Sequence, residues 1–237
     1  MKHVGLNVAA DPLFTLSYTG VNAGMVIVVA DDPGMHSSQN EQDSRNYAKA
    51  SKIPMLEPAD SQECLSFTKL AYDISERYDT PVIIRLTTRI SHSRSLVEVG
   101  ERVDNGLKEY VKDTQKYVMM PAMAKKKHVI VEERTKALTA WGESEAIDLG
   151  VNKIEYNDKK IGIITGGIAY QYAKEALGDK ASYLKLGCLY PLPEKLLRDF
   201  AAECEKVYVI EELDPYIEDH CRKLGINVIG KEQFTLL

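Results

Sequence analysis

The chain has 237 residues, of which 44% are hydrophobic and 27% charged, and its formal net charge is −5. This composition is typical of a globular protein, and the acidic balance argues against a nucleic-acid-binding surface, which needs a dense basic face. The sequence contains neither a signal peptide nor an apolar run approaching the roughly twenty residues of a membrane span. We therefore expect a cytoplasmic protein that contacts neither nucleic acid nor membrane.

The first part of the chain alternates helices and strands. Asp11-Pro12 begins a short predicted helix that ends near Gly20, and the run 25–30 is the first predicted strand. A continuous β-branched run of this kind is typical of a parallel strand buried on both faces. A helix is expected around 40–49.

The alternation continues to about residue 86. A short strand at 53–56 precedes a helix that Asp60 and Glu63 begin with a capping-box pattern. This helix keeps one apolar face as far as Tyr78, and 82–86 is another buried strand. The series β-α-β-α-β predicts an α/β fold with a doubly wound sheet.

A charged stretch separates this series from a second one. Residues 91–157 contain few strand patterns and two expected helices, one near 122–150, which we interpret as a helical linker. From Lys160 onward a second α/β series begins, with strands expected at 161–165, 183–186, 207–210 and 226–229. We expect two doubly wound domains at 1–95 and 155–237, joined by the linker 96–154.

The four cysteines are scattered singly and form no C-x-x-C pair, so no zinc site or iron–sulfur cluster is expected in this chain. Isolated thiols of this kind are typical of a reducing compartment.

The first strand leads into a loop, Asp31 to Asp43, with unusually many polar side chains. Ligands of parallel sheets gather at the carboxyl ends of strands, so this loop is the first candidate site. The Asp31-Asp32 pair could bind magnesium or accept a phosphoryl group, but the strand at 82–86 ends in Thr87-Thr88-Arg89, without the acid that a receiver domain requires. Alternatively, Asp32 caps the turn at Pro33-Gly34. We leave these two roles open.

The middle of the loop carries the better candidates for chemistry. His36, Ser37 and Ser38 can act as acid, hydrogen-bond donors or an anion cradle, and Gln39 extends the same polar surface. Glu41 and Asp43 are expected in the first turn of the following helix, where acids complement the helix dipole.

Two further segments contain candidate residues. His3 to Asn7 reads as a polar loop at a strand end, where Gly5 would allow close backbone approach to a ligand. Arg89 and His92 follow the strand at 82–86, and Arg89 could hold a carboxylate or form an interdomain ion pair.

Two other patterns favour structural roles. The glycines at 162, 166 and 167 lack the spacing of a dinucleotide site, so helix packing is the better interpretation. For Glu211-Glu212 we favour interface ion pairing over an acid site.

Several segments together resemble the large (alpha) subunit of indolepyruvate:ferredoxin oxidoreductase, in the thiamine diphosphate-dependent 2-oxoacid:ferredoxin oxidoreductase family. The resemblance covers essentially all 237 residues, and the stretch His-Ser-Ser-Gln-Asn-Glu-Gln-Asp is its most specific part. The segments are MKHVGLNVAADP at 1–12, DDPGMHSSQNEQD at 31–43, PVIIRLTTRISHS at 81–93, LYPLP at 189–193 and VIEELDP at 209–215.

The resemblance implies oxidative decarboxylation of an arylpyruvate to an acyl-CoA, with ferredoxin as electron acceptor and a beta subunit as partner in an oligomer. It implies a partial pyrimidine-binding domain followed by a transketolase C-terminal-like domain. The site residues that it implies fall into three groups: catalytic His36, Ser37 and Ser38; cofactor-binding His3, Gly5, Asn7, Asp32 and Gln39; and substrate-binding Arg89 and His92.

The resemblance also implies parts that this sequence lacks. These are a preceding stretch with the glutamate that contacts the pyrimidine, a later domain that binds the diphosphate through magnesium, and the cysteine-rich region of the iron–sulfur clusters. We therefore expect a fragment that is inactive by itself. The alternatives are a non-catalytic assembly segment and a transketolase-like thiamine enzyme that does not use ferredoxin.

Overall fold

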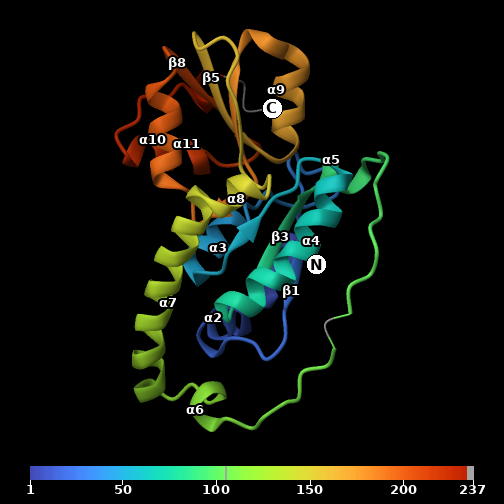
Figure 1. Ribbon diagram of the computed structural model, residues 1–237, viewed down its shortest axis with the longest axis vertical. Coiled ribbons are helices and arrows are strands. Elements are labelled where there is room, and N and C mark those ends of the chain that lie inside the picture. Colours follow the sequence, from blue (N-terminus) through green and yellow to red (C-terminus); the bar gives the residue numbers. More distant parts are fainter. Residues whose placement is uncertain (105, 234–237) are drawn as a thin grey trace.

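The computed structural model describes residues 1–104 and 106–233. It contains two four-stranded sheets, one above the other in Figure 1, each with helices on both faces. This arrangement confirms the α/β class and the two doubly wound units expected from the sequence.

The first sheet has the strand order β1-β3-β2-β7. Strands β1 (Val26–Asp31), β3 (Val82–Thr87) and β2 (Met55–Leu56) are parallel, and β7 (Cys188–Tyr190) pairs antiparallel with β2. The register places Asp31 opposite Thr87, so the polar residues that end β1 and β3 lie side by side.

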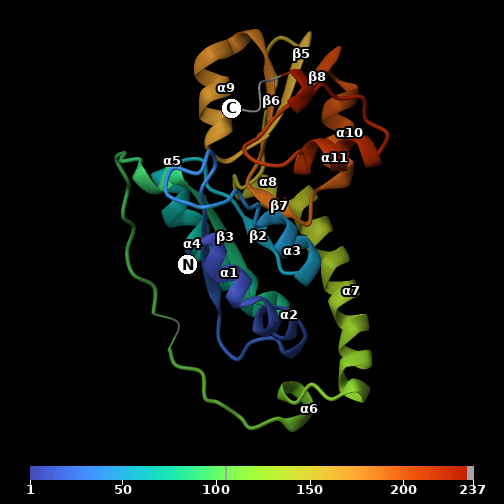
Figure 2. The same cartoon turned by 180° about the vertical axis from the view of Figure 1, so that it is seen from behind.

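Helices cover both faces of this sheet, which explains why its strands read as continuous apolar runs. One face carries α1 (His3–Val8), α2 (Ala10–Thr19) and α3 (Arg45–Ser51), which are seen in front in Figure 2. The other face carries α4 (Ser61–Tyr78), and α7 (Pro121–Glu143) runs along the side of the unit, from contacts with α2 to the core beneath α4. Asp60 caps α4 by accepting a hydrogen bond from the Glu63 amide, as the capping-box pattern predicts.

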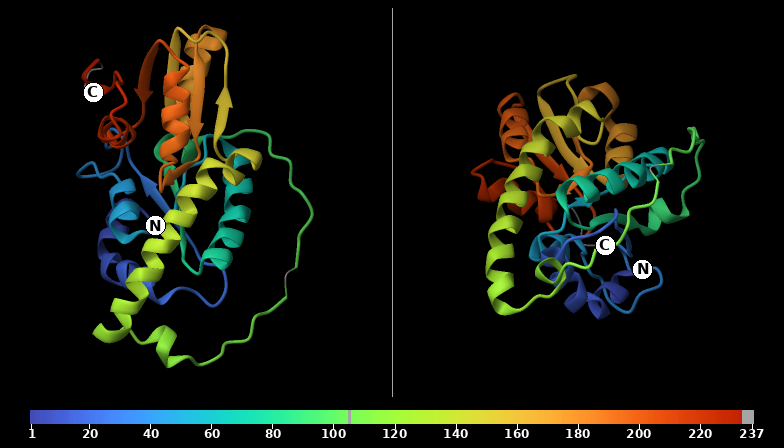
Figure 3. Two further views of the ribbon diagram at one scale, coloured as in Figure 1. Left: turned by 60° about the vertical axis from the view of Figure 1, so that its left-hand side comes forward. Right: turned by 60° about the horizontal axis from the view of Figure 1, so that its bottom comes forward.

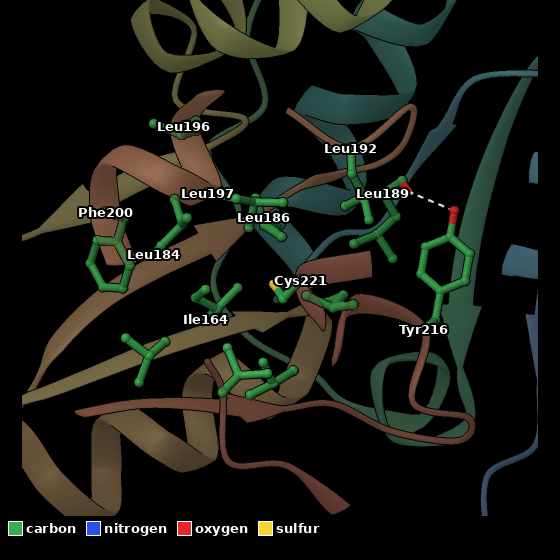
Figure 4. Packing of buried hydrophobic residues seen from close by; sticks show 14 residues of the cluster. Ile164, Leu184, Leu186, Leu189, Leu192, Leu196, Leu197, Phe200, Tyr216 and Cys221 are labelled. Atoms are coloured by element: carbon green, nitrogen blue, oxygen red, sulfur yellow. Dashed lines mark hydrogen bonds between the residues drawn. The ribbon is translucent and has the colours of Figure 1, made fainter. Parts of the chain in front are cut away.

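The second sheet has the order β4-β6-β5-β8. Strands β6 (Ser182–Leu186), β5 (Ile161–Gly166) and β8 (Lys206–Ile210) are parallel, and β4 (Lys153–Glu155) is an antiparallel edge strand that the sequence did not suggest. Helix α9 (Gly167–Leu177) covers one face, and α10 (Glu194–Ala202) and α11 (Tyr216–Lys223) cover the other. Figure 4 shows the apolar cluster between this sheet and the last two helices.

The remaining elements are short. They are α5 (Thr88–His92), α6 (Thr114–Tyr117), α8 (Glu145–Asp148) and two single 3₁₀ turns, η1 (Gly178–Lys180) and η2 (Lys231–Gln233). None of the helices in the described residues is long and apolar enough to cross a membrane.

The helix expected near 122–150 is confirmed as α7, but it belongs to the first unit. Its Leu138 and Trp141 are buried in the core under β2 and β3, and Arg134 donates to the Ser17 carbonyl oxygen. Strand β7 likewise carries a late part of the sequence into the first sheet. The domain boundaries at 95 and 154 stay a prediction.

Two expected elements are wrong in extent. The helix expected at 40–49 begins only at Arg45, because Asp31 accepts hydrogen bonds from the Ser44 amide and hydroxyl and holds the preceding residues in a loop. The expected strand at 226–229 is reduced to an isolated bridge between Ile229 and Tyr208.

Gly187 lies at the point where the chain passes from the second sheet into the first. A Cβ atom built there would come within 2.3 Å of the Val151 carbonyl oxygen and 2.9 Å of the Phe67 ring. The buried Asn152 side chain accepts hydrogen bonds from the amides of Gly187 and Cys188 and donates to the Gly142 carbonyl oxygen. This crossing therefore has no room for a larger residue.

We predict that Gly187→Ala lowers the free energy of unfolding by about 2–3 kcal/mol, because the added methyl group forces a backbone shift in a packed region. Gly142→Ala is the matched control, since its Cβ would meet no atom closer than 3.7 Å. Urea unfolding followed by circular dichroism measures both variants. Equal stability of the two would contradict this account of the crossing.

Candidate functional site

The carboxyl ends of the two parallel sheets face each other. Glu57, which follows β2, lies against Gly167, which follows β5: a Cβ on Gly167 would be 2.2 Å from the Glu57 carboxylate. Arg45, which follows the β1 loop, pairs at 2.5 Å with Glu211 at the end of β8. The polar loops that end the strands of both sheets therefore meet along one line, where ligands of such sheets bind.

Arg85 is the central residue at the point where the ends of β1, β2 and β3 meet. It sits in the middle of β3, is 1% exposed, and donates from Nε to Asp31 at 2.7 Å and from Nη1 to Glu57 at 2.6 Å. Asp31 also accepts the two hydrogen bonds from Ser44. A buried guanidinium needs such partners because its desolvation is costly, so Arg85 fixes the ends of β1 and β2 relative to β3.

Arg45 is the central residue at the point where the β1 loop meets the end of β8. Besides Glu211, it pairs with Asp43 at 2.5 Å and donates to the carbonyl oxygens of Glu212 and Asp214. Glu211 in turn accepts from the first amides of α11. The Glu211-Glu212 segment therefore has the interface role that we favoured from the sequence, and Arg45 connects the β1 loop to the second sheet.

The carboxyl groups that pair with Arg45 and Arg85 differ in the direction in which their pKa is shifted. Burial raises the pKa of Glu57 and of Glu211 above the ordinary range, against the opposing charges of Arg85 and Arg45. Burial also acts to raise the pKa of Asp43, but the charges of Arg45 and Arg85 outweigh it and lower that pKa. Burial and the charges of the arginines therefore act in opposite directions on the pKa of each of these carboxyl groups.

Asp32 organises the loop that follows β1. One carboxylate oxygen accepts from the Thr88 hydroxyl at 2.7 Å, and the other accepts from the Ser38 hydroxyl at 2.6 Å and the Ser37 amide at 2.8 Å. Hydrogen bonds from Ser38, Thr88 and Ser37 lower the pKa of Asp32. This geometry supports the capping role of Asp32 that the sequence left open, extended from the turn to the whole segment 36–38.

The loop turns through two successive left-handed residues, Gly34 with φ of +80° and Met35 with φ of +53°. A left-handed backbone is unfavourable for methionine and is retained where surrounding contacts impose it, often at functional sites. Here Glu41 accepts from the Gly34 amide at 2.8 Å. Glu41 and Asp43 therefore hold the loop and its neighbours, and the expectation that they lie in the first turn of α3 is wrong.

The side chains of His36 and Ser37, which follow this turn, are exposed, and so is the side chain of Gln39. The His36 ring approaches Gly34, where a Cβ would lie 3.6 Å from Nε2. Ser38 is half-buried because its hydroxyl binds Asp32. The loop thus presents an imidazole, a hydroxyl and an amide to solvent on a backbone that Asp32 fixes.

The segment His3 to Asn7 is helix α1 rather than the loop expected from the sequence. It still lies next to the β1 loop: Lys2 Nζ donates to the Ser37 carbonyl oxygen at 2.8 Å, and Asn7 donates to Gln42 at 2.8 Å. Gly5 packs against the chain start, where a Cβ added to it would lie 3.3 Å from the Met1 Cβ. The two cofactor-binding segments predicted from the sequence are therefore neighbours in space.

Several buried polar atoms at this edge lack a hydrogen-bond partner among the described residues. They are both ring nitrogens of His3, Asp31 Oδ1, Arg85 Nη2 and Thr87 Oγ1. Such atoms are rare in proteins and indicate that the edge can satisfy further donors and acceptors of a ligand or water.

The two residues predicted to bind substrate are close in sequence but differ in their contacts. Arg89 is exposed and pairs with Glu212 at 2.8 Å, which is the interdomain ion pair offered as its alternative role. His92 is exposed at the end of α5. Arg89 would have to leave Glu212 to bind a substrate carboxylate.

Sequence reasoning missed Arg45, Glu57, Arg85 and Thr88. A signal was present for Arg85, since an arginine inside an apolar strand must find buried acids. No local sequence pattern indicates Glu57 or Thr88, because their hydrogen-bond partners, Arg85 and Asp32, are distant in the chain.

The residues present fit one end of thiamine diphosphate. The unpartnered His3 nitrogens and the exposed amide and hydroxyl groups suit the polar edge of an aminopyrimidine ring. The diphosphate end is different: among residues 1–104 and 106–233, no group of three or more histidine, cysteine or acidic side chains is placed to hold a metal ion.

The chain resembles known proteins in sequence and in fold. Residues 18–157 match the family described as pyruvate flavodoxin/ferredoxin oxidoreductase, thiamine diphosphate-binding. The chain is 43% identical over 98% of its length to "Indolepyruvate oxidoreductase subunit IorA" of Archaeoglobus fulgidus, and 41% identical over its whole length to that of Methanothermobacter thermautotrophicus. It spans only 37% and 40% of those two relatives.

Two solved structures share the fold. The 2-oxoglutarate:ferredoxin oxidoreductase of Magnetococcus marinus, with 2-oxoglutarate, coenzyme A and succinyl-CoA bound, matches 97% of this chain and 48% of its own with a TM-score of 0.66 and 16% identity. An inactive split-gene transketolase tetramer matches 94% of this chain and 62% of its own with a TM-score of 0.50 and 18% identity.

We predict that Arg45→Met lowers the free energy of unfolding by about 3–5 kcal/mol, because Asp43 and Glu211 are left buried without their counter-ion. Arg77→Met is the control: its pair with Glu145 is exposed, so stability should change little. Denaturant unfolding measures both. A loss no larger than that of the control would show that the buried pair is dispensable.

We predict that Asp32→Asn loosens the loop while leaving the global stability nearly unchanged. Hydrogen exchange should accelerate at the amides of His36 and Ser37, which bind the Asp32 carboxylate. Asp73→Asn, a change at an exposed acid of α4, should leave these amides unaffected.

The same carboxylate gives a pH dependence with a defined sign. A lowered folded-state pKa means that Asp32 stabilises the loop above its unfolded value of about 4, and that this contribution is lost as pH falls through the folded-state pKa. Protection of the His36 and Ser37 amides should therefore persist at about pH 3, below the ordinary pKa of an aspartate. Its loss between about pH 5 and pH 3 would indicate an unshifted carboxyl group.

Proposed function

Because the chain belongs to the pyruvate flavodoxin/ferredoxin oxidoreductase family, in its thiamine diphosphate-binding part, we propose that it forms the pyrimidine-side wall of the cofactor site in an indolepyruvate oxidoreductase. The relatives named for that activity are about two and a half times as long, so the activity, substrate and partners of the whole protein are part of this proposal.

One observation carries the proposal. Helix α1 and the β1 loop, which are 35 residues apart, are joined by two hydrogen bonds, Lys2–Ser37 before the helix and Asn7–Gln42 in its last turn. Both segments were assigned to the cofactor from the resemblance alone. Their convergence beside the unpartnered His3 ring supports a shared ligand.

Bound thiamine diphosphate would supply the nucleophilic carbon and the electron sink for decarboxylation of a 2-oxoacid. The residues of this chain would hold and orient it: His3, Asn7 and Gln39 would offer polar groups to the aminopyrimidine edge. Asn7 would exchange its hydrogen bonds with Gln42 and Tyr47 for the ligand. Asp32 acts through the backbone, keeping the segment 36–38 in place. Gly5 allows α1 to pack closely against the chain start.

His36, Ser37 and Ser38 would serve the reacting centre. The His36 imidazole is exposed and can donate a hydrogen bond or a proton to a developing oxyanion. The Ser37 hydroxyl is exposed and donates to Asp32 only at 3.5 Å, whereas the half-buried Ser38 hydroxyl is held by Asp32 at 2.6 Å. Ser38 therefore contributes mainly by fixing the loop.

The substrate end would involve Arg89 and His92. Arg89 can bind a carboxylate through two parallel hydrogen bonds once it leaves Glu212. An arylpyruvate provides this carboxylate. In the proposed reaction, coenzyme A takes up the acyl group and ferredoxin accepts the electrons through iron–sulfur clusters and a beta subunit, all outside this chain.

Two alternatives remain as outcomes of the test. A non-catalytic assembly segment would bind the other subunit without contributing to the cofactor site. A transketolase-like enzyme would use thiamine diphosphate without ferredoxin, and the fold shared with the split-gene transketolase is the observation behind it.

The test uses this chain combined with the complementary portion of an IorA subunit and its partner subunit, assayed by indolepyruvate-dependent reduction of ferredoxin. We predict that His36→Ala lowers kcat at least about 100-fold, as loss of a general acid does. His128→Ala, on α7 and bound to Tyr18, should retain full activity.

Three results would contradict the proposal. Activity unaffected by His36→Ala would remove this loop from the chemistry. Thiamine diphosphate binding by the assembly, measured by calorimetry, that does not change on Asn7→Ala and Gln39→Ala would make this chain an assembly segment. Turnover without ferredoxin reduction would favour the transketolase-like alternative.

A further inference from the structure

Glu212, at the end of the second sheet, is the partner of the arginine that the proposed function assigns to the substrate. The two units stand one above the other in Figure 1 and in the left view of Figure 3. Arg89 follows β3 of the first unit, and Glu212 follows β8 of the second. Their ion pair, from Nη1 to Oε1 at 2.8 Å, therefore crosses from one unit to the other.

This ion pair uses only part of the hydrogen-bonding capacity of its two side chains. An arginine and a carboxylate commonly form two parallel hydrogen bonds. Within the part of the chain that the structure describes, the bond from Nη1 to Oε1 is the one hydrogen bond that either side chain makes. Glu212 Oε2 is buried and has no partner there. The Arg89 side chain is 42% exposed, so a carboxylate that arrives from solvent can reach it.

The backbone of the loop that carries Glu212 is held in place by other contacts. Arg45 donates hydrogen bonds to the carbonyl oxygens of Glu212 and Asp214. Leu213 between them has a left-handed backbone with φ of +66°. Such a backbone is unfavourable for leucine and is retained where surrounding contacts impose it. The loop therefore keeps Glu212 beside Arg89 whether or not their side chains are paired.

The surroundings of Glu212 make Arg89 its natural counter-ion. Burial is the main cause of the raised pKa of Glu57, and the negative charge of Glu212 adds to it, so Glu212 lies within electrostatic reach of a second acid. The buried arginines Arg45 and Arg85 are already paired with other acids. Because an unpaired charge is unfavourable away from water, Glu212 attracts Arg89 whenever no other carboxylate binds it.

We propose that Glu212 is a positioning residue for the substrate: it holds Arg89 while the site is empty and yields it to the carboxylate of the 2-oxoacid. Because Arg89 is taken as the residue that binds this carboxylate, the role of Glu212 rests on the proposed function. The substrate gains a two-bond contact with Arg89 in place of the single bond to Glu212. Decarboxylation then removes the carboxylate as carbon dioxide, and Arg89 returns to Glu212.

Two consequences follow for the site. The second unit takes part in substrate binding, although it contributes no residue to the cofactor end of the proposed site. In addition, each substrate molecule must displace Glu212. The ion pair therefore lowers the apparent affinity for the substrate in proportion to the fraction of Arg89 that is engaged.

Steady-state kinetics with indolepyruvate as the varied substrate tests this role, in the assembly of the chain with the complementary portion of an IorA subunit and its partner subunit. Glu212→Gln removes the competing charge, so it should lower KM about 3- to 10-fold and change kcat less than about twofold. Glu145→Gln is the matched control, because it breaks the exposed Arg77–Glu145 pair outside the site and should leave both constants unchanged. An unchanged or raised KM in Glu212→Gln would overturn the proposal.

Arg89→Met separates this role from the proposed function. It should raise KM, and an unchanged KM would remove Arg89 from the substrate site and the role of Glu212 with it. A KM raised by Arg89→Met but unchanged by Glu212→Gln would overturn the role of Glu212 alone. In the Arg89→Met background, Glu212→Gln should have no further effect, because the two residues act as one unit. A decrease of KM that persists there would mean that Glu212 repels the substrate directly, which contradicts the proposal.

Calorimetry with two ligands gives a readout that does not require turnover. Indole-3-lactate carries a carboxylate but no keto group, and its methyl ester carries no charge. Glu212→Gln should tighten the binding of indole-3-lactate by the same factor as KM and leave the binding of the ester unchanged. Equal effects on the two ligands would indicate altered packing rather than competition for Arg89, and would also overturn the proposal.

Discussion

Two arginine side chains, Arg45 and Arg85, lie buried where the carboxyl ends of the two sheets meet, and the rest of the site depends on their pairing. Arg85 joins the ends of β1, β2 and β3 through Asp31 and Glu57. Arg45 joins the β1 loop to the end of β8 through Asp43 and Glu211. Because an unpaired charge is very costly in this environment, the four acids and both loops must take up defined positions.

The polar side chains of the site form two groups: those buried in the ion pairs of Arg45 and Arg85, and those exposed on the β1 loop. The acids that look catalytic in the sequence are used to hold arginines, to anchor Ser44 and to fix the segment 36–38. The side chains exposed at the surface are the His36 imidazole, the Ser37 hydroxyl and the Gln39 amide. In the proposed function, the chemistry at this edge would be carried by exposed groups on a backbone that the buried ion pairs hold in place.

The two halves of the chain also exchange elements. Strand β7 extends the first sheet, and α7 buries Leu138 and Trp141 in the first core. Both the ionic layer and these elements oppose separation of the halves, so the site between the sheet ends should keep its geometry.

The sequence by itself determined the α/β class, most helices and strands, the capped start of α4 and the loop that bears the candidate chemistry. These features depend on local periodicity and turn residues, which a single sequence displays. Only the tertiary structure decided that His3 to Asn7 is helical, that Asp31, Glu57 and Glu211 meet two arginines, and that β7 crosses into the first sheet. Those outcomes depend on contacts between residues far apart in the chain, and no local pattern encodes which distant partner a buried charge or an edge strand will find.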